Sequence, residues 1–151
     1  MKICHHVETI QTGEGISIIN INDDINNAIR HSGITQGFAI ISSRHTTTAV
    51  CVNEYEDRLL EDIKAWLCKL APADEKYLHN DIDQRDCPPD EPENAHSHLM
   101  AMLLGSSEAI PITSRKLAIG EFQSVMLLDL DGPRERTVNI QIMGEDKKSW
   151  G

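Results

Sequence analysis

Apolar and polar residues alternate in several short segments of the chain, and this period of two is typical of half-buried β-strands. Near the N-terminus the pattern predicts strands over residues 3–10 and 16–21, joined as a hairpin by a turn at Gly13 and Gly15. Five later segments also have strand character, over residues 37–43, 49–52, 109–112, 122–130 and 137–143. The last two are expected to form a second hairpin around Gly132 and Pro133.

Helical periodicity is clearest over residues 55–70, where apolar residues recur every three or four positions and Pro72 follows the last of them. The polar stretch from Pro72 to Pro92 is long for a connection within one domain. It is therefore predicted to be a functional or interface loop.

Two shorter helices are predicted from their capping signals. The first is capped by Asp23 or Asp24 and ends at Gly33, where a left-handed residue is needed. The second is capped by Asn94 and ends at Gly105.

Adjacent strands with a few helices on one side predict the α+β class, with a mainly antiparallel sheet or sandwich and two to three helices. The length of 151 residues suits one core, and the 40% of hydrophobic residues can fill it. We expect one compact domain over residues 1–145 and a C-terminal tail over residues 146–151. The sequence has no GxGxxG, P-loop or GxSxG motif to indicate a nucleotide-binding or α/β-hydrolase fold.

The net charge of −10 disfavours binding to nucleic acids and to anionic membranes. No apolar run has the length of a signal core or a membrane span, so a cytoplasmic protein is expected. The four cysteines are widely spaced and include no CxxC pair, which predicts reduced thiols rather than a zinc ribbon or a disulfide framework.

Three separated histidines are the main candidates for chemistry. His45 follows a buried strand and precedes the hydroxyl of Thr46, at a position where a rigid side chain can face a cleft. His79 lies in the long polar loop, and His98 lies near the start of the third helix. His96 ranks lower because residues two apart on a helix point to nearly opposite sides. Taken singly, each histidine is also explained as a surface or capping residue.

Gathered together, the three imidazoles would form either an acid-base site or a zinc-type site with an open position that activates water or polarises a phosphoryl or carbonyl oxygen. Asn53 and Glu54, at a strand-to-helix junction, add a candidate carboxylate ligand or general base. The alternative for Glu54 is an acid that stabilises the helix dipole.

Arg134 and Arg136 lie two residues apart in a predicted strand, so they would share one face and could clamp a phosphate or carboxylate. The alternative is a surface ion pair with Asp131 or Glu135, which contributes little.

Short motifs that resemble the YjbQ family occur in order over nearly the whole chain. They are His45-Thr46-Thr47-Thr48-Ala49 with Asn53-Glu54, Tyr77-x-His79-Asn80-Asp81, Asn94-Ala95-His96-Ser97-His98-Leu99 with Leu104-Gly105, Ile110-Pro111-Ile112, Leu117-x-x-Gly120, Gln123, Asp131-Gly132-Pro133-Arg134-x-Arg136 and Gly144-Glu145. Each motif is short, but together they are specific.

The resemblance implies a compact α+β homotrimer with clefts between subunits, and a thiamine-phosphate synthase activity. It also implies a divalent-metal or anion site at His45, His79 and His98, with Asn53 and Glu54 nearby. On this basis His45, Glu54 and His98 are the expected catalytic residues. The residues expected to bind the substrate or another anion are Thr46, Asn53, Asn94, Arg134 and Arg136.

Two segments depart from the pattern of the family. Its Gly-Thr-Trp-Gln is replaced here by Gly120-Glu121-Phe122-Gln123, which puts the wall of the pocket in doubt and adds a negative charge. Its usual glycine is missing around Ser114-Arg115-Lys116, which is expected to change a turn.

Three functions follow as alternatives. The leading one is a transferase of the thiamine-phosphate synthase type, which joins hydroxymethylpyrimidine pyrophosphate to thiazole phosphate and releases pyrophosphate. The second is metal-assisted hydrolysis of a small phosphate or acyl substrate, which suits three imidazoles better because magnesium prefers carboxylates. The third is a non-catalytic trimeric module that binds a small anion or a partner protein.

Overall fold

The computed structural model describes residues 1–146, so the predicted C-terminal tail beyond Asp146 lies outside the described residues. Two 3₁₀ turns, η1 (Leu78–Asn80) and η2 (Ile82–Gln84), lie in the long polar loop. In chain order the other elements are β1 (Lys2–Gln11), β2 (Gly15–Asn20), α1 (Asn22–Ser32), β3 (Gln36–Ser43), β4 (Thr48–Asn53), α2 (Asp57–Leu70), α3 (Ala95–Leu104), β5 (Ser107–Thr113), β6 (Lys116–Leu117), β7 (Ser124–Gly132) and β8 (Glu135–Glu145).

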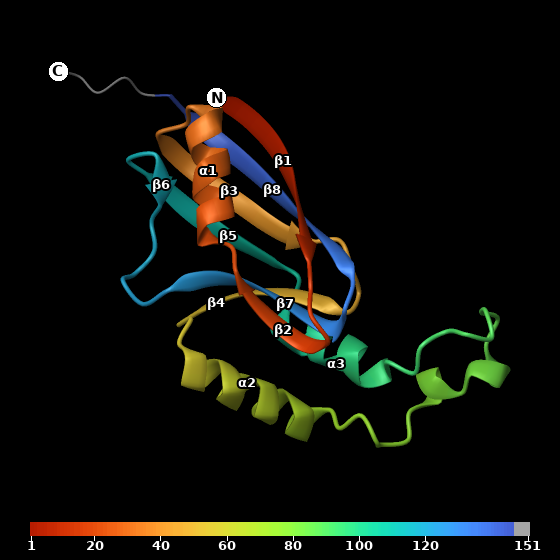
Figure 1. Cartoon of the computed structure of the whole chain (residues 1–151). Helices are drawn as coiled ribbons and strands as arrows, with labels where there is room; N and C mark the ends of the chain where they lie inside the picture. The colour runs from red at the N-terminus through yellow and green to blue at the C-terminus, as the bar shows by residue number, and fades with distance from the viewer. Residues whose placement is uncertain (147–151) are drawn as a thin grey trace.

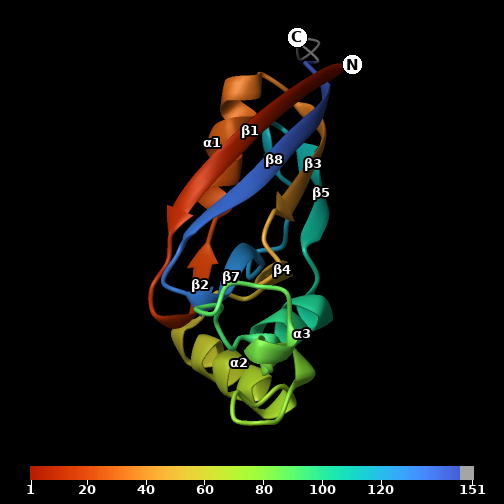
Figure 2. The same ribbon diagram turned by 90° about the vertical axis from the view of Figure 1, so that its right-hand side faces the viewer.

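The strands form two antiparallel sheets (Figure 1). The larger sheet has the order β1-β8-β3-β5-β6, and the smaller has the order β2-β7-β4. Figure 2 shows α1 on one side of the larger sheet, whereas α2 and α3 lie together beside the smaller one. The predicted α+β fold with antiparallel strands and two to three helices is confirmed.

Two hydrophobic cores lie on opposite faces of the smaller sheet. Ile25 and Ile29 of α1 pack in the first core together with residues of both sheets. Leu67 of α2 and Met100 of α3 pack in the second core. Because both faces of β7 are covered, Ser124–Leu130 is buried without interruption instead of alternating, as is usual for strands inside a domain.

Both predicted hairpins are wrong, because each pair of consecutive strands is divided between the two sheets. β1 pairs with β8, and β2 pairs with β7, so the four strands form one long antiparallel ribbon that bends at its middle. The chain bends between β1 and β2 and again between β7 and β8, and these two corners lie against each other. Thr12 N–H in the first donates to the Arg134 carbonyl in the second at 3.0 Å. A Cβ on Gly132 would lie 2.1 Å from the Gly13 carbonyl oxygen, so only glycine permits this approach.

The caps of α1 differ in part from the prediction. Ile21 is the N-cap and makes no capping hydrogen bond with its side chain, while Asp23 and Asp24 lie in the first turn. There they stabilise the positive end of the helix dipole. Gly33 has a φ of 74° and ends the helix as predicted.

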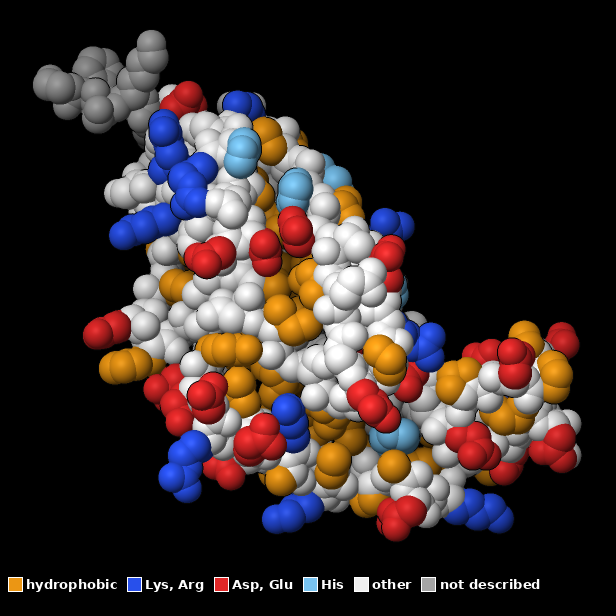
Figure 3. All heavy atoms as spheres, in the orientation of Figure 1, with side chains coloured by type: hydrophobic (Ala, Val, Ile, Leu, Met, Phe, Trp, Pro, Cys, Tyr) orange, Lys and Arg blue, Asp and Glu red, His pale blue; other side chains and the backbone are white. Residues whose placement is uncertain are grey.

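The long loop between α2 and α3 projects from the body of the molecule (Figure 1). It carries acidic and apolar side chains on the face seen in Figure 3. Its η1 turn returns to α3, where Asn80 Oδ1 accepts a hydrogen bond from Ala95 N–H at 3.1 Å. Within residues 1–146, no helix has both the length and the apolar character needed to cross a bilayer.

Candidate functional site

His45 lies in the short loop between β3 and β4, which is shaped by hydroxyl groups. The Ser43 hydroxyl accepts from His45 N–H at 3.1 Å, and the Thr48 hydroxyl donates to the His45 carbonyl at 3.2 Å. These two side chains also hydrogen-bond each other. The hydroxyl-rich sequence therefore satisfies the backbone of a tight connection and holds His45 beside β8.

The His45 ring is bound to β8 through one nitrogen. Its Nε2 accepts a hydrogen bond from the backbone N–H of Thr137 at 2.9 Å and lies 3.1 Å from the Thr137 hydroxyl. Burial lowers the pKa of His45 below its ordinary value, and the positive charge of Arg136 acts in the same direction. Both effects favour a neutral imidazole.

His98 and His79 come together although they are nineteen residues apart in the sequence. Their ring centroids are 4.7 Å apart, with one ring edge facing the other ring at 78°. Burial lowers the pKa of His98, and His79 lowers it further, while a hydrogen bond to the Thr46 backbone raises it. The 3₁₀ turn η1 places His79 against the first turns of α3.

His45 and His98 line the same pocket, which has a volume of about 600 Å³. This volume lies within the usual range for small-molecule sites. The described lining comes from the β3–β4 loop, from α3 and from the start of β5, and consists of Ser43, Arg44, His45, Thr46, Thr48, His98, Ala101, Met102, Gly105 and Ser106.

His96 faces a different part of the molecule from His98. It lines a second pocket of about 470 Å³ between α2, α3 and the start of β2. This separation follows from the spacing of two residues on a helix.

The predicted three-histidine metal site is not formed within the described chain. No group of three or more His, Cys, Asp or Glu side chains in residues 1–146 is arranged to hold a metal ion. Moreover, Nε2 of His45 accepts a hydrogen bond from Thr137 N–H, and His79 and His98 meet edge to face. A zinc site requires three or four protein ligands, and the described residues of one chain do not by themselves gather that many.

Asn53 and Glu54 lie at the far end of β4 from the histidines. Both side chains are exposed, and Asn53 Oδ1 accepts a hydrogen bond from the N–H of Glu54 at 2.8 Å. Five residue steps from Thr48 to Asn53 span about 17 Å of extended strand. Within one chain, the structure therefore does not bring Glu54 to His45.

Arg136 is not a free anion-binding residue, contrary to the prediction. It is 4% exposed and donates to both carboxylate oxygens of Asp129, from Nε at 2.9 Å and from Nη2 at 2.8 Å. Its Nη2 also donates to the Thr47 hydroxyl at 2.7 Å. Arg136 and Arg134 thus point to different environments and cannot form one clamp.

Asp129 is the important polar residue that the sequence reading missed. Burial alone would raise its pKa, but hydrogen bonds from Arg136, Thr12 and the Asp131 backbone outweigh burial and hold the pKa below its ordinary value. A signal was present, because Asp129 stands alone between Leu128 and Leu130 in an apolar run. A charge in such a run requires a buried partner.

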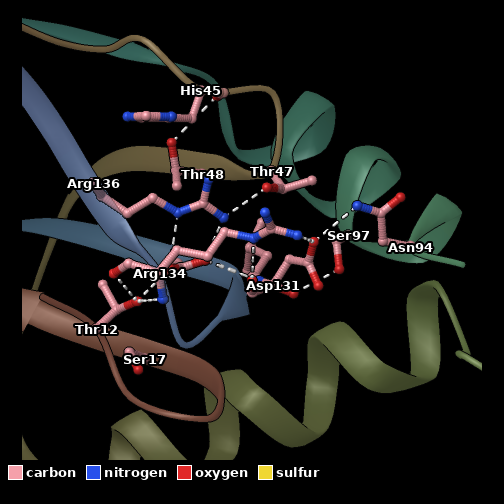
Figure 4. Close-up of polar contacts among 12 residues, drawn as sticks. Thr12, Ser17, His45, Thr47, Thr48, Asn94, Ser97, Asp131, Arg134 and Arg136 are labelled. Atoms are coloured by element: carbon pink, nitrogen blue, oxygen red, sulfur yellow. Dashed lines mark hydrogen bonds and ion pairs between the residues drawn. The ribbon is translucent and has the colours of Figure 1, made fainter. Parts of the chain in front are cut away.

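Arg134 and Asn94 meet at the carboxylate of Asp131 (Figure 4). Arg134 Nη2 lies 3.0 Å from Asp131 Oδ2, and its Nε donates to the Asp131 carbonyl at 3.0 Å. Asn94 Nδ2 donates to the same Oδ2 at 2.8 Å. Asn94 is therefore at the predicted N-cap position of α3, but its side chain connects the helix to the β7–β8 corner instead of capping it.

Four arginines lie near the two pocket histidines in a chain whose net charge is −10. Arg136, Arg44 and Arg134 each lower the pKa of His45. Arg85, whose Nη1 donates to the His79 carbonyl at 2.9 Å, lowers the pKa of His98. Arg136 and Arg134 are paired with Asp129 and Asp131, whose charges oppose this effect, so an anion would be attracted mainly by Arg44 and Arg85.

The two departures from the pattern of the family lie away from this pocket. Phe122 is 69% exposed and precedes Ser124, the partner of Asn53 at the far end of the smaller sheet. Ser114 and Arg115 form the turn between β5 and β6, with φ values of 50° and 63°. A left-handed turn of this kind is where glycine is usually found.

Two curated proteins are similar in sequence to this chain over nearly its whole length. The UPF0047 protein of Methanothermobacter thermautotrophicus is 36% identical over 136 residues, covering 90% of this chain and 89% of the relative. The UPF0047 protein of Archaeoglobus fulgidus is 36% identical over 135 residues, covering 89% of this chain and 98% of the relative.

Solved structures give the same result. A YbjQ-like protein of unknown function from Sulfolobus solfataricus has a TM-score of 0.86 at 32% identity, covering 95% of this chain and 99% of that one. A hypothetical protein from Aeropyrum pernix has a TM-score of 0.84 at 32% identity, covering 93% and 98%. The family model described as UPF0047 protein YjbQ-like matches residues 6–145, and this chain therefore belongs to the YjbQ-like UPF0047 family.

Proposed function

We propose that this chain is an enzyme that acts on a small phosphorylated or otherwise anionic molecule in the pocket between His45 and His98. One observation carries the proposal: two imidazoles from separate elements line one pocket, and Arg44 and Arg85 near them supply positive charge in an acidic chain. Neutral imidazoles can move protons near neutral pH, and guanidinium groups stabilise phosphate oxygens.

The specific reaction that we propose is of the thiamine-phosphate synthase type, in which pyrophosphate leaves as the pyrimidine and thiazole parts are joined. Its substrates and products are anionic, which suits the positive charges of Arg44 and Arg85 near the histidines. We assign Arg134 a role in holding a phosphate, because its side chain is 44% exposed, its charge acts on His45, and Asp131 fixes its direction. No step is routed through a metal, because the described residues of one chain do not gather three metal donors.

We also propose that the chain assembles as a homotrimer and that a neighbouring copy supplies Asn53 and Glu54 to the pocket. Two features support this arrangement. Those two residues are too far from His45 within one chain, and α3 exposes an apolar face formed by Leu99, Met102 and Leu103. Burial of such a face is favourable, and Met102 also lines the pocket.

Anion binding is the first test. Inorganic phosphate added to ¹⁵N-labelled protein should shift the amide signals of Thr46 and Ser106, which line the pocket. Arg134→Gln should weaken binding about tenfold, because it removes one charge-assisted hydrogen bond. Lys64→Gln is the matched control and should bind phosphate normally, because Lys64 lies in α2 and lines the second pocket instead. Equal binding by all three proteins would contradict the proposed pocket.

Catalysis is the second test. Purified untagged protein should release pyrophosphate from the pyrimidine pyrophosphate only when the thiazole phosphate is present, and His98→Ala should abolish this release. Zinc-dependent hydrolysis of a phosphate ester, without the transfer reaction, would favour a metal-assisted hydrolase. Phosphate binding without any turnover would favour a non-catalytic trimeric module.

A further inference from the structure

The hydrogen bond between Thr137 and His45 determines which nitrogen of His45 carries a proton. A backbone N–H can only donate, and it lies 2.9 Å from Nε2 of His45. Nε2 must therefore present a lone pair. In this geometry His45 is neither an imidazolium nor the Nε2–H tautomer, so its single ring proton lies on Nδ1.

The hydrogen bond of His98 to the backbone runs in the opposite direction, because here the ring nitrogen is the donor. His98 hydrogen-bonds to the backbone of Thr46, and a carbonyl can only accept, so the bonded ring nitrogen carries the proton. The other nitrogen of neutral His98 then presents a lone pair. The edge-to-face contact with His79 packs the ring in this orientation.

We propose that the two pocket histidines have fixed and complementary roles, with His45 as a permanent N–H donor to an oxyanion of the ligand and His98 as the proton acceptor. This inference rests on the proposed function and deepens it. Neither histidine could exchange roles with the other without losing its hydrogen bond to the backbone. Thr137 and Thr46 act as positioning residues through their main-chain groups.

The roles define the chemical class of the substrate. It carries an oxyanion, such as a phosphate monoester, next to an O–H or N–H group that loses its proton. That proton moves to the free nitrogen of His98, and the electron pair of the broken O–H or N–H bond stays on the substrate. Burial and the neighbouring His79 lower the pKa of His98, whereas the bond to Thr46 and the negative charge of Asp131 partly offset them and so support the transient imidazolium.

The protonation states can be tested without a substrate. Long-range ¹H–¹⁵N spectra of the full chain labelled at histidine should show His45 as the Nδ1–H tautomer at pH 7. Thr137→Val keeps the main-chain N–H and should leave that tautomer unchanged. An Nε2–H tautomer or an imidazolium at His45 would overturn the proposal, and so would a change of tautomer in the valine variant.

The division of roles needs a second experiment with inorganic phosphate as the probe. His45→Ala should weaken phosphate binding about tenfold, and His45→Asn, whose amide N–H takes the place of Nδ1–H, should restore most of it. His98→Ala should change phosphate binding less than about twofold but slow any turnover at least about a hundredfold. Loss of phosphate binding in His98→Ala, or no loss in His45→Ala, would contradict the assignment.

The two proposals fail in different ways. If wild-type protein does not bind phosphate, the proposed function fails even when His45 shows the expected tautomer. If phosphate binds and His45 carries its proton on Nε2, the proposed function stands and the assignment of roles is wrong. Spectra of each variant that match the wild type away from the pocket show that the variant has folded.

Discussion

Arg136 and Asp129 form a two-bond ion pair that is almost completely withdrawn from water, with side-chain exposures of 5% and 0%. The pair joins β7 to β8 close to the corner where the chain passes between the two sheets. Through Thr47 it also holds the loop that carries His45. The position of the candidate site therefore depends on a charge pair that does not itself face the ligand.

Removing one partner of this pair should be severely destabilising. Arg136→Met leaves the Asp129 carboxylate buried without its cation and is expected to lower the free energy of unfolding by about 3–5 kcal/mol. Urea unfolding at pH 7, followed by circular dichroism, measures the change. Arg134→Met removes the half-exposed pair with Asp131 and should cost less than about 1 kcal/mol. Similar losses in both variants would show that burial of the Asp129 pair does not matter.

The same pair predicts how stability depends on acid. The pKa of Asp129 is below its ordinary value of 3.8 in the folded protein, so the unfolded chain binds the proton more readily. Its stabilising contribution is complete above the unfolded pKa and is lost as the pH falls through the folded pKa. Urea unfolding at a series of pH values should therefore show a steeper loss below pH 3.8 in the wild type than in Asp129→Asn. Parallel curves would mean that the pKa of Asp129 is not lowered.

The turn between β5 and β6 offers a stabilising change. Ser114 and Arg115 both have positive φ, and both are exposed, so neither side chain contributes to the core. The double substitution Ser114→Asn and Arg115→Gly supplies the pair that this turn type prefers and should raise the free energy of unfolding by about 1 kcal/mol. Thermal unfolding should show a higher midpoint. An unchanged or lower unfolding midpoint would contradict the left-handed conformation of this turn.

The close approach of β3 and β8 should not tolerate a methyl group. A Cβ on Gly144 would lie 2.0 Å from the Gln36 carbonyl oxygen, and a backbone atom cannot turn aside. Gly144→Ala is expected to destabilise the protein by about 1–3 kcal/mol, as overpacking does. Gly13→Ala is the control, because its Cβ would meet only the Ser17 hydroxyl at 3.4 Å. Chemical denaturation that gives equal stabilities would contradict this packing.

Local patterns predicted most elements correctly because each depends on neighbouring residues. The helix predicted over residues 55–70 is observed as Asp57–Leu70, with Glu56 accepting a hydrogen bond from Leu59 N–H at 2.6 Å. Gly33 ends α1, and the α+β class follows from the order of strands and helices. The hairpins were wrong because the pairing partner of a strand is chosen by packing across the whole domain, which alternation does not encode.

The sequence by itself determined where the chain is extended or helical, which residues can carry chemistry, and that the chain resembles one family. Only the tertiary structure decided which of those residues meet. It brought His98 beside His79 and into one pocket with His45, buried Arg136 against Asp129, and left Glu54 at the other end of a strand. The reason is physical: burial, hydrogen-bond direction and charge pairing act between segments that are close in space, and the spacing of residues along the chain does not specify them.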